Sequence, residues 1–123
     1  MSRDWRDFLA DVATHAAIAA DIAARHEPTD LDGDPVIRLA LERALEIVGE
    51  AAGRIPGEVQ ARHPDIPWRA MIGARHRLAH GYFALDRALL WRTAREVIPA
   101  TLPRLHEIVR LEAADRPPTE DEP

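Results

Sequence analysis

The sequence predicts an all-α protein built as an antiparallel bundle of four or five helices. Three observations lead to this fold class. Apolar residues recur at steps of three and four over long stretches, which is the period of an amphipathic helix. Clusters of proline and glycine divide the chain at positions that suit helix ends. No stretch of useful length alternates between apolar and polar residues, so nothing predicts a strand.

The first predicted helix runs from Asp4 to His26, because its apolar residues fall on one face and most of its aspartates on others. The segment from Glu27 to Gly33 is rich in turn formers, so we expect it to break this helix. The expected buried stripe is Trp5, Phe8, Leu9, Val12, Ala16, Ala19 and Ala23.

Asp34 and Pro35 predict the start of the second helix. Aspartate is a favoured N-cap residue, and proline fits the first helical position. Pro56 interrupts the pattern, and residues 58–62 allow only a short helical turn before the proline-bracketed loop 63–67. The expected buried stripe of the second helix is Ile37, Leu41, Ala44, Leu45, Val48, Ala51, Ala52 and Ile55.

A third substantial helix is predicted from Trp68 to Ala79, with Gly81 as its C-cap glycine. Asp86 is then expected to cap a further helix. Its core candidates, and those of the third helix, are apolar residues at helical spacing: Trp68, Met71, Ile72, Leu78, Ala79, Leu89, Leu90, Ala94 and Val97.

Two prolines are expected to end or kink that further helix, Pro99 and Pro103, with Thr101 as an N-cap for a last helical segment. We therefore expect one helical domain over residues 1–110. Residues 111–123 are acidic and proline-rich, so we expect them to form a disordered tail.

Composition excludes several classes of site. The 123 residues include no cysteine, which rules out disulfides, cysteine-bound zinc, iron–sulfur clusters and thiol nucleophiles, and fits a reducing cytoplasm. The amino-terminal residues mix charges with apolar residues, unlike a signal peptide or a membrane span. We expect a cytoplasmic protein without a membrane segment.

Charge is distributed unevenly along the chain. The net charge is −5, yet residues 68–110 contain 8 arginines and 3 acidic residues. This local positive excess can meet a polyanion such as nucleic acid.

The chemistry is concentrated between Arg75 and Tyr82, where two arginines, two histidines and a phenol fall within eight residues. If the helix ends near Ala79, His80 lies at its carbonyl end, which favours an imidazolium and makes this ring a proton donor near neutral pH. An arginine beside it can neutralise the charge that grows on a phosphoryl group. Arg75 and His80 therefore suit cleavage of a phosphodiester without a metal ion.

The motif R-x4-H-x-Y, matched by Arg75, His80 and Tyr82, resembles that of the HepT-like toxin ribonucleases of the HEPN superfamily. Three segments are similar to that family in the same order, namely residues 44–56, 63–83 and 89–105. One position departs from the pattern, because His76 stands where relatives commonly have asparagine.

The resemblance implies a HEPN-like homodimer in which two motifs face a shared cleft that cuts single-stranded RNA. The protein would be the toxin of a type II/VII-like toxin–antitoxin system, with a minimal nucleotidyltransferase as antitoxin and no cofactor. His80 would transfer protons, Arg75 would hold the phosphate, and His76 and Arg77 would bind or orient the substrate. Tyr82 would be the residue that the antitoxin nucleotidylates.

Each motif residue also has a purely structural interpretation. Arg75 could pair with an acid of the second helix, Glu46 or Glu50. His80 could merely satisfy carbonyls at a helix end, and Tyr82 could anchor the turn against the bundle. In that case the chain would be a non-catalytic helical module that binds a partner or a nucleotide.

His76 and His80 are four residues apart and could share a helix face as metal ligands. They lack an obvious third ligand, and Arg75 and Arg77 would repel a dication. We therefore expect no metal site.

We interpret the remaining aromatic and basic residues as structural. Trp68 and Trp91 are expected to be packing anchors, although one exposed near the cleft could stack on RNA. An arginine run is expected to form a solvated face: Arg87, Arg92, Arg95 and Arg104. The other histidines are expected at the core edge or surface: His15, His26, His63 and His106.

Overall fold

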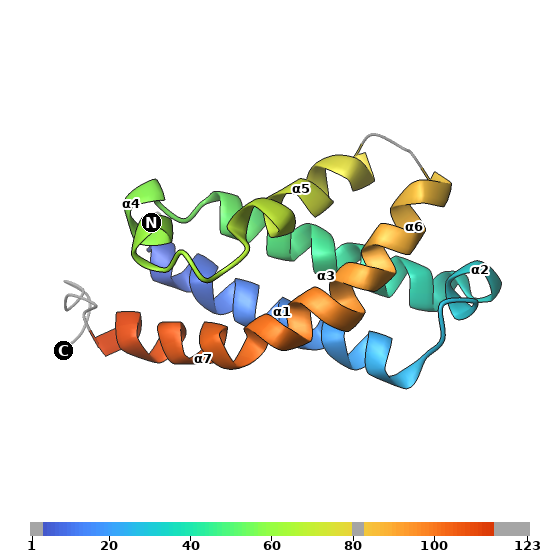
Figure 1. Cartoon of the computed structure of the whole chain (residues 1–123), viewed down its shortest axis with the longest axis horizontal. Coiled ribbons are helices and arrows are strands. Elements are labelled where there is room, and N and C mark those ends of the chain that lie inside the picture. Colours follow the sequence, from blue (N-terminus) through green and yellow to red (C-terminus); the bar gives the residue numbers. More distant parts are fainter. Residues whose placement is uncertain (1–3, 80–82, 115–123) are drawn as a thin grey trace.

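The computed structural model describes the backbone of residues 4–79 and 83–114 and the side chains of residues 4–73 and 87–114. The described residues are helical apart from short connections, and they include no strand. This confirms the predicted all-α class (Figure 1).

Helix α1 spans Trp5–Arg25, close to the predicted bounds. The Asp4 carboxylate accepts a hydrogen bond from the Arg6 backbone N–H at 2.8 Å, which satisfies one of the free donors at the helix start. The predicted stripe is buried from Leu9 onward, whereas Trp5 and Phe8 are half-buried against the core.

The segment after α1 is more ordered than the sequence indicates. It contains α2, a single helical turn over Asp30–Gly33 whose Leu31 is buried. Helix α3 spans Pro35–Gly53 and begins as predicted, with the Asp34 carboxylate accepting from the Val36 N–H at 2.9 Å.

Helix α4 is a short element over Gly57–Arg62, and α5 spans Trp68–Ala79, as predicted. Gln60 on α4 closes the carboxyl end of α3, because its side-chain amide donates to the carbonyls of Ala52 at 3.2 Å and Ile55 at 3.0 Å.

Helix α6 spans Phe83–Arg92, so the prediction that Asp86 caps this helix is wrong. Ala84 and Leu85 are good helix formers and extend the helix toward the amino end, which leaves Asp86 near its start, where the helix dipole favours a negative charge.

The prolines after α6 bend the chain but do not end the helix. A π-helical turn, η1 (Thr93–Val97), leads directly into α7 (Ile98–Ala114), and Figure 1 shows α6 and α7 running in different directions. Pro99 lacks an N–H, and its ring would clash with the carbonyl four residues earlier in a regular helix. The wider π turn, in which the Ile98 N–H donates to the Thr93 carbonyl, avoids that clash.

Thr101 is not the N-cap that the sequence indicates, because it lies inside α7 and its hydroxyl donates to the Val97 carbonyl at 2.9 Å. Helix α7 also continues four residues past the expected domain boundary at 110, and Glu112 in this extension is buried. The prediction of a disordered tail over residues 111–123 is therefore wrong for 111–114, which are helical, and its remainder, 115–123, lies outside the described residues.

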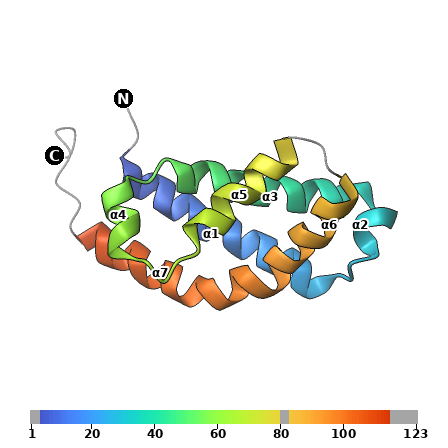
Figure 2. The same ribbon diagram turned by 45° about the horizontal axis from the view of Figure 1, so that its top comes forward.

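Helix α1 packs between α3 and α7, and α5 packs on α3 (Figures 1 and 2). Both neighbours of α1 are antiparallel to it. The Arg54 guanidinium at the end of α3 lies 5.4 Å from the centre of the Phe8 ring, and Arg6 donates to the carbonyl of Glu112 at the end of α7. The largest fully buried side chains are Leu9, Val12, Leu41, Leu45, Val48, Met71, Ile98, Leu105 and Ile108.

Candidate active site

The motif lies at the junction of α5 and α6. Arg75, His76 and Arg77 are on the last turns of α5, which ends at Ala79. His80, Gly81 and Tyr82 lie outside the described residues, as do the side chains of the three α5 residues. The end of α5 and the start of α6 lie at the same end of the molecule, and the two helices contact each other (Figure 1).

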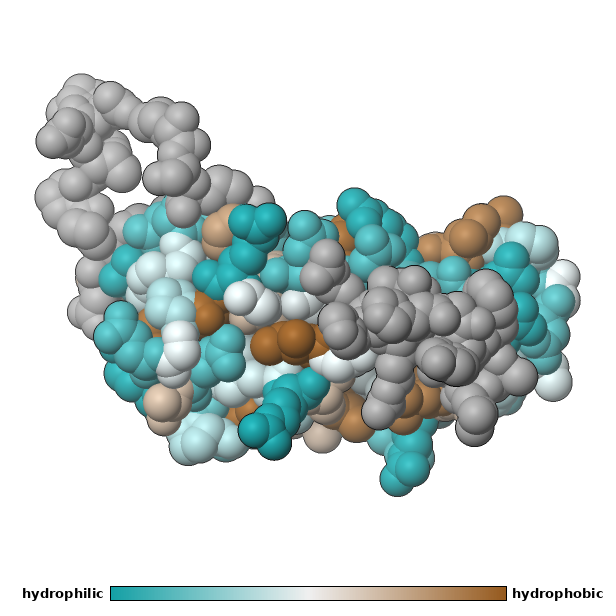
Figure 3. All heavy atoms as spheres, turned by 90° about the horizontal axis from the view of Figure 1, so that it is seen from above, coloured by the Kyte–Doolittle hydropathy of each residue, from teal (hydrophilic) through white to brown (hydrophobic). Residues whose placement is uncertain are grey.

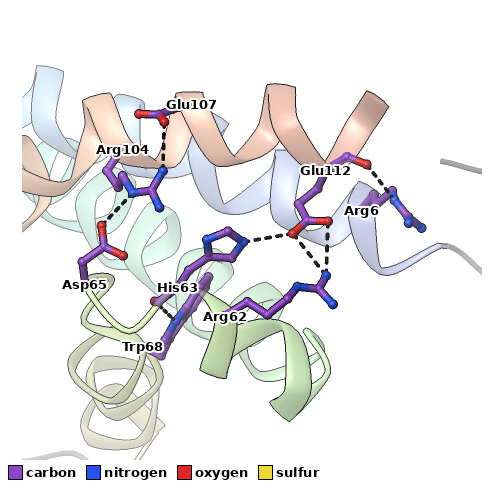
Figure 4. Close-up of polar contacts among 8 residues, drawn as sticks. All are labelled: Arg6, Arg62, His63, Asp65, Trp68, Arg104, Glu107 and Glu112. Carbon is purple, nitrogen blue, oxygen red and sulfur yellow. Dashed lines mark hydrogen bonds and ion pairs between the residues drawn. The ribbon is translucent and has the colours of Figure 1, made fainter. Parts of the chain in front are cut away.

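The opposite end of α5 is fixed by polar contacts from the preceding loop. The Trp68 indole N–H donates to the His63 carbonyl at 3.0 Å, and the Trp68 side chain is buried. Trp68 is therefore the packing anchor that the sequence predicts. Figure 4 shows this contact beside a group of charged residues that join the loop to α7.

Glu112 is the centre of that group (Figure 4). Its carboxylate accepts from the Arg62 guanidinium at 3.1 Å and from Nε2 of His63 at 2.9 Å, and its side chain is only 9% exposed. These two hydrogen bonds, His63 first, hold the pKa of Glu112 below its ordinary value of 4.5 against the opposing effect of burial.

The two ring nitrogens of His63 differ in their contacts. The ionised Glu112 carboxylate can only accept, so Nε2 carries the shared proton. Nδ1 is buried and has no hydrogen-bond partner in the part of the chain that the structure describes.

A second ion pair supports the same loop from the outside. The Arg104 guanidinium donates to the Asp65 carboxylate at 2.7 Å and lies 3.1 Å from Glu107 on its own helix. The hydrogen bond from Arg104 lowers the pKa of Asp65. Loop 63–67, and with it the start of α5, is thus tied to α7 at two points.

The sequence interpretation missed the His63–Glu112 contact. It assigned His63 to the core edge or surface and placed Glu112 in the tail. The available signal was the helical register of Glu112, which follows Leu105 and Ile108 at three- and four-residue steps on a buried stripe. A charged residue in such a stripe requires a buried partner.

The arginine run is engaged within the chain. Arg87 pairs with Asp32, Arg92 with Glu96, and Arg104 with Asp65, while Arg95 donates to the carbonyl of Ala23 at 3.5 Å. Arg92 and Arg95 are exposed, as expected of a solvated face, whereas Arg87 and Arg104 are half-buried.

The two acids named as alternative partners of Arg75 contact arginines of their own helix. Glu46 lies 3.1 Å from Arg43, and Glu50 lies 3.9 Å from Arg54. The alternative metal pair, His76 and His80, has no described side-chain positions. Across the side chains that are described, no three acids or histidines are grouped as a metal site requires.

No helix within residues 4–79 and 83–114 has the length and apolar character to cross a bilayer. The coloured surface in Figure 3 mixes hydrophilic and hydrophobic side chains, and the hydrophobic ones form separate patches on this face.

Comparison with known proteins identifies the family. Residues 12–110 match the family described as "Ribonuclease HepT-like". The protein named "Probable ribonuclease HepT" from Thermococcus cleftensis is 38% identical over 100 residues, which cover 81% of this chain and 91% of the relative. "Putative RNase MJ1380" from Methanocaldococcus jannaschii is 35% identical over 97 residues, covering 79% and 89%. The search of solved structures finds no significant match. The predicted family is thereby confirmed, and the chain belongs to the HepT-like ribonuclease family.

Proposed function

We propose that this protein is a toxin endoribonuclease that cleaves single-stranded RNA without a metal ion. The observation that carries the proposal is the family match over residues 12–110, which includes the complete R-x4-H-x-Y motif. The relatives named as ribonucleases and the excess of arginine over residues 68–110 support it.

In the proposed reaction, the ribose 2′-hydroxyl attacks the adjacent phosphorus. The 2′-oxygen loses its proton and the 5′-oxygen leaves with one, so the products are a 2′,3′-cyclic phosphate and a 5′-hydroxyl end. His80 transfers protons in this step, and Arg75 neutralises the charge that builds on the phosphoryl oxygens. The mechanism requires the 2′-hydroxyl, which makes RNA and not DNA the substrate.

The neighbouring residues complete the proposed site. His76 and Arg77 bind or orient the substrate, and Tyr82 is the position at which a minimal nucleotidyltransferase antitoxin modifies the toxin. The site works in a homodimer whose two motifs face a shared cleft, in the cytoplasm of the cell. Loop 63–67 and its contacts with α7 fix the far end of the helix that carries Arg75.

The direct test is incubation of the purified protein with total RNA, with and without EDTA. We expect cleavage in both conditions and 5′-hydroxyl ends on the products. Intact RNA after incubation would favour the non-catalytic interaction module. Loss of cleavage in EDTA that zinc restores would assign His76 and His80 to a metal site.

The residue assignment is tested with His80→Ala and Arg75→Ala. Each is expected to abolish cleavage and growth inhibition with little change in thermal stability, because both side chains are proposed to act on the phosphate and not in the core. Arg69→Ala is the matched control, since Arg69 is exposed on the same helix but outside the motif. Wild-type cleavage by the His80→Ala protein would remove His80 from the mechanism.

A further inference from the structure

A pocket of about 490 Å³ lies between α2 and α6, the helix that follows the motif. Figures 1 and 2 both show these helices side by side at one end of the molecule. Its volume falls within the range of small-ligand sites. Its described lining consists of Pro28, Leu31, Asp32, Arg87, Ala88 and Trp91.

Trp91 is the aromatic residue in the described lining of the pocket. The ring is half-buried, with part of it packed against the core and part lining the pocket. It therefore differs from Trp68, which is buried and whose indole N–H is used within the fold. Pro28 and Leu31 are the apolar residues that line the pocket from the segment containing α2. A nucleobase binds by stacking on an aromatic ring, and neighbouring apolar side chains favour such a contact.

The polar edge of the pocket is the ion pair between Arg87 and Asp32. Among the described residues, the buried Nε of Arg87 has no hydrogen-bond partner, which is an unusual state for a guanidinium donor. Arg87 and Asp32 both line the pocket, so the pair brings guanidinium donors and carboxylate acceptors to it. Nucleobase edges present the matching acceptors and donors.

The pocket also lies close to the motif along the chain. Helix α6 begins one residue after Tyr82, and Arg87 and Trp91 follow its first residue by four and eight positions. At 1.5 Å of rise per residue these positions are about 6 Å and about 12 Å along the helix from its start.

We propose that this pocket is a base subsite, in which one nucleobase of the RNA substrate stacks on Trp91 and hydrogen-bonds to the Arg87–Asp32 pair. The assignment of the base to a substrate strand rests on the proposed ribonuclease function. The subsite selects a base near the scissile phosphate, a task that the R-x4-H-x-Y motif itself does not perform.

The first experiment observes the indole N–H signals of the ¹⁵N-labelled wild-type protein by NMR during titration with AMP, GMP, CMP and UMP. The chain has three tryptophans, and Trp91→Phe assigns the Trp91 signal. We expect at least one nucleotide to shift the Trp91 signal in a saturable way. Trp5 is the internal control, because it is also half-buried but lies on α1 away from the pocket. An unchanged Trp91 signal with all four nucleotides, or equal shifts of Trp5 and Trp91, would overturn the subsite.

The second experiment measures binding of a fluorescent, random-sequence single-stranded RNA 12-mer to full-length protein carrying His80→Ala, so that no substrate is consumed. Adding Trp91→Ala is expected to weaken binding about tenfold, the usual effect of removing one stacking platform. Trp91→Phe keeps an aromatic side chain and should lose less. A Trp91→Ala protein that retains its fold and binds within twofold of its parent would contradict the proposal.

Arg87→Ala and Arg92→Ala form a matched pair on α6 with the same change of charge. Arg92 is 73% exposed, pairs with Glu96 and does not line the pocket. We expect Arg87→Ala to weaken RNA binding several-fold more than Arg92→Ala. Equal effects would mean that only overall charge matters and would count against the subsite.

The two proposals fail separately. Nucleoside monophosphates contain no phosphodiester to cleave, so the NMR result does not depend on catalysis. A Trp91 shift in a protein that leaves RNA intact would keep the subsite and overturn the nuclease. Cleavage of RNA by a protein whose Trp91 signal is unchanged by all four nucleotides would support the nuclease and overturn the subsite.

Discussion

Glu112 is a buried carboxylate whose ionised form the fold stabilises, and this makes it a source of acid sensitivity. Its folded-state pKa lies below 4.5, because His63 and Arg62 donate hydrogen bonds to it. The unfolded chain therefore binds this proton more readily than the folded one. The stabilisation is complete above about pH 4.5 and is lost as the pH falls through the lower, folded-state pKa.

We predict that Glu112→Gln lowers the free energy of unfolding by about 1–3 kcal/mol at pH 7, since hydrogen bonds to a charged acceptor are replaced by weaker ones. Chemical denaturation of both proteins from pH 7 to pH 3 measures the effect. The difference between them should shrink as the pH falls below about 4.5, where the unfolded wild-type chain takes up this proton, and should be lost once the pH passes the lower pKa of the folded protein.

The matched control for this experiment is Glu107→Gln, which changes an exposed carboxylate on the same helix. Its effect should stay within about 0.5 kcal/mol, as is usual for a surface ion pair. A Glu112→Gln difference that remains constant down to pH 3 would contradict the assigned pKa shift.

Tyr82 carries the prediction about regulation. A nucleotidyl group on its phenol would add negative charge and bulk beside the proposed phosphate site, and so oppose RNA binding. Co-expression with a cognate minimal nucleotidyltransferase should raise the mass of the Tyr82 peptide by one or more nucleotidyl units and silence cleavage. Tyr82→Phe should keep much of its activity and escape silencing. Full neutralisation of Tyr82→Phe, with no mass shift in the wild type, would show inhibition by occlusion instead.

Among the helices, α3 offers a clean test of local sequence rules. Asp34 accepts from the Val36 N–H, and Pro35 follows at the first helical position. We predict that Asp34→Ala destabilises the protein by about 1 kcal/mol, the usual loss for an N-cap. Asp34→Ser should recover most of this stability, because serine also accepts at the cap. Thermal unfolding measures both, and equal melting temperatures for all three proteins would refute the capping role.

The element bounds show which features of the fold the sequence predicts. The bounds of α1, α3 and α5 follow from side-chain period, caps and prolines, which act between residues close in the chain. The sequence alone could not predict that the helix continues through Pro99 and Pro103. A proline inside a helical pattern predicts that the helix either ends or kinks there. Which of the two occurs depends on the burial of Ala94, Ile98 and Leu105 against the rest of the bundle. Tertiary packing favours the widened turn.

In the candidate site, too, the sequence predicts features that are local in the chain and misses those that join distant residues. The motif residues are close in sequence, so the resemblance identifies them without a structure. The contacts of His63 with Glu112 and of Asp65 with Arg104 join positions 49 and 39 residues apart. The pocket beside α6 likewise needs Asp32 and Arg87, which are 55 positions apart. Only the folded chain brings these groups together.

For the whole molecule, the proposed mechanism requires two copies. A chain of 13.7 kDa carries one motif at the end of one helix pair, and a cleft needs a second wall. Two-fold pairing is the commonest way to supply it.

We predict that light scattering at micromolar concentration gives twice the mass of the chain. Cleavage per protomer should then fall on dilution over the same range in which the dimer dissociates, while Arg69→Ala, outside the motif, should follow the wild-type curve. A 13.7 kDa species that cleaves RNA with undiminished activity per protomer would rule out the shared cleft, and each motif would then have to act alone.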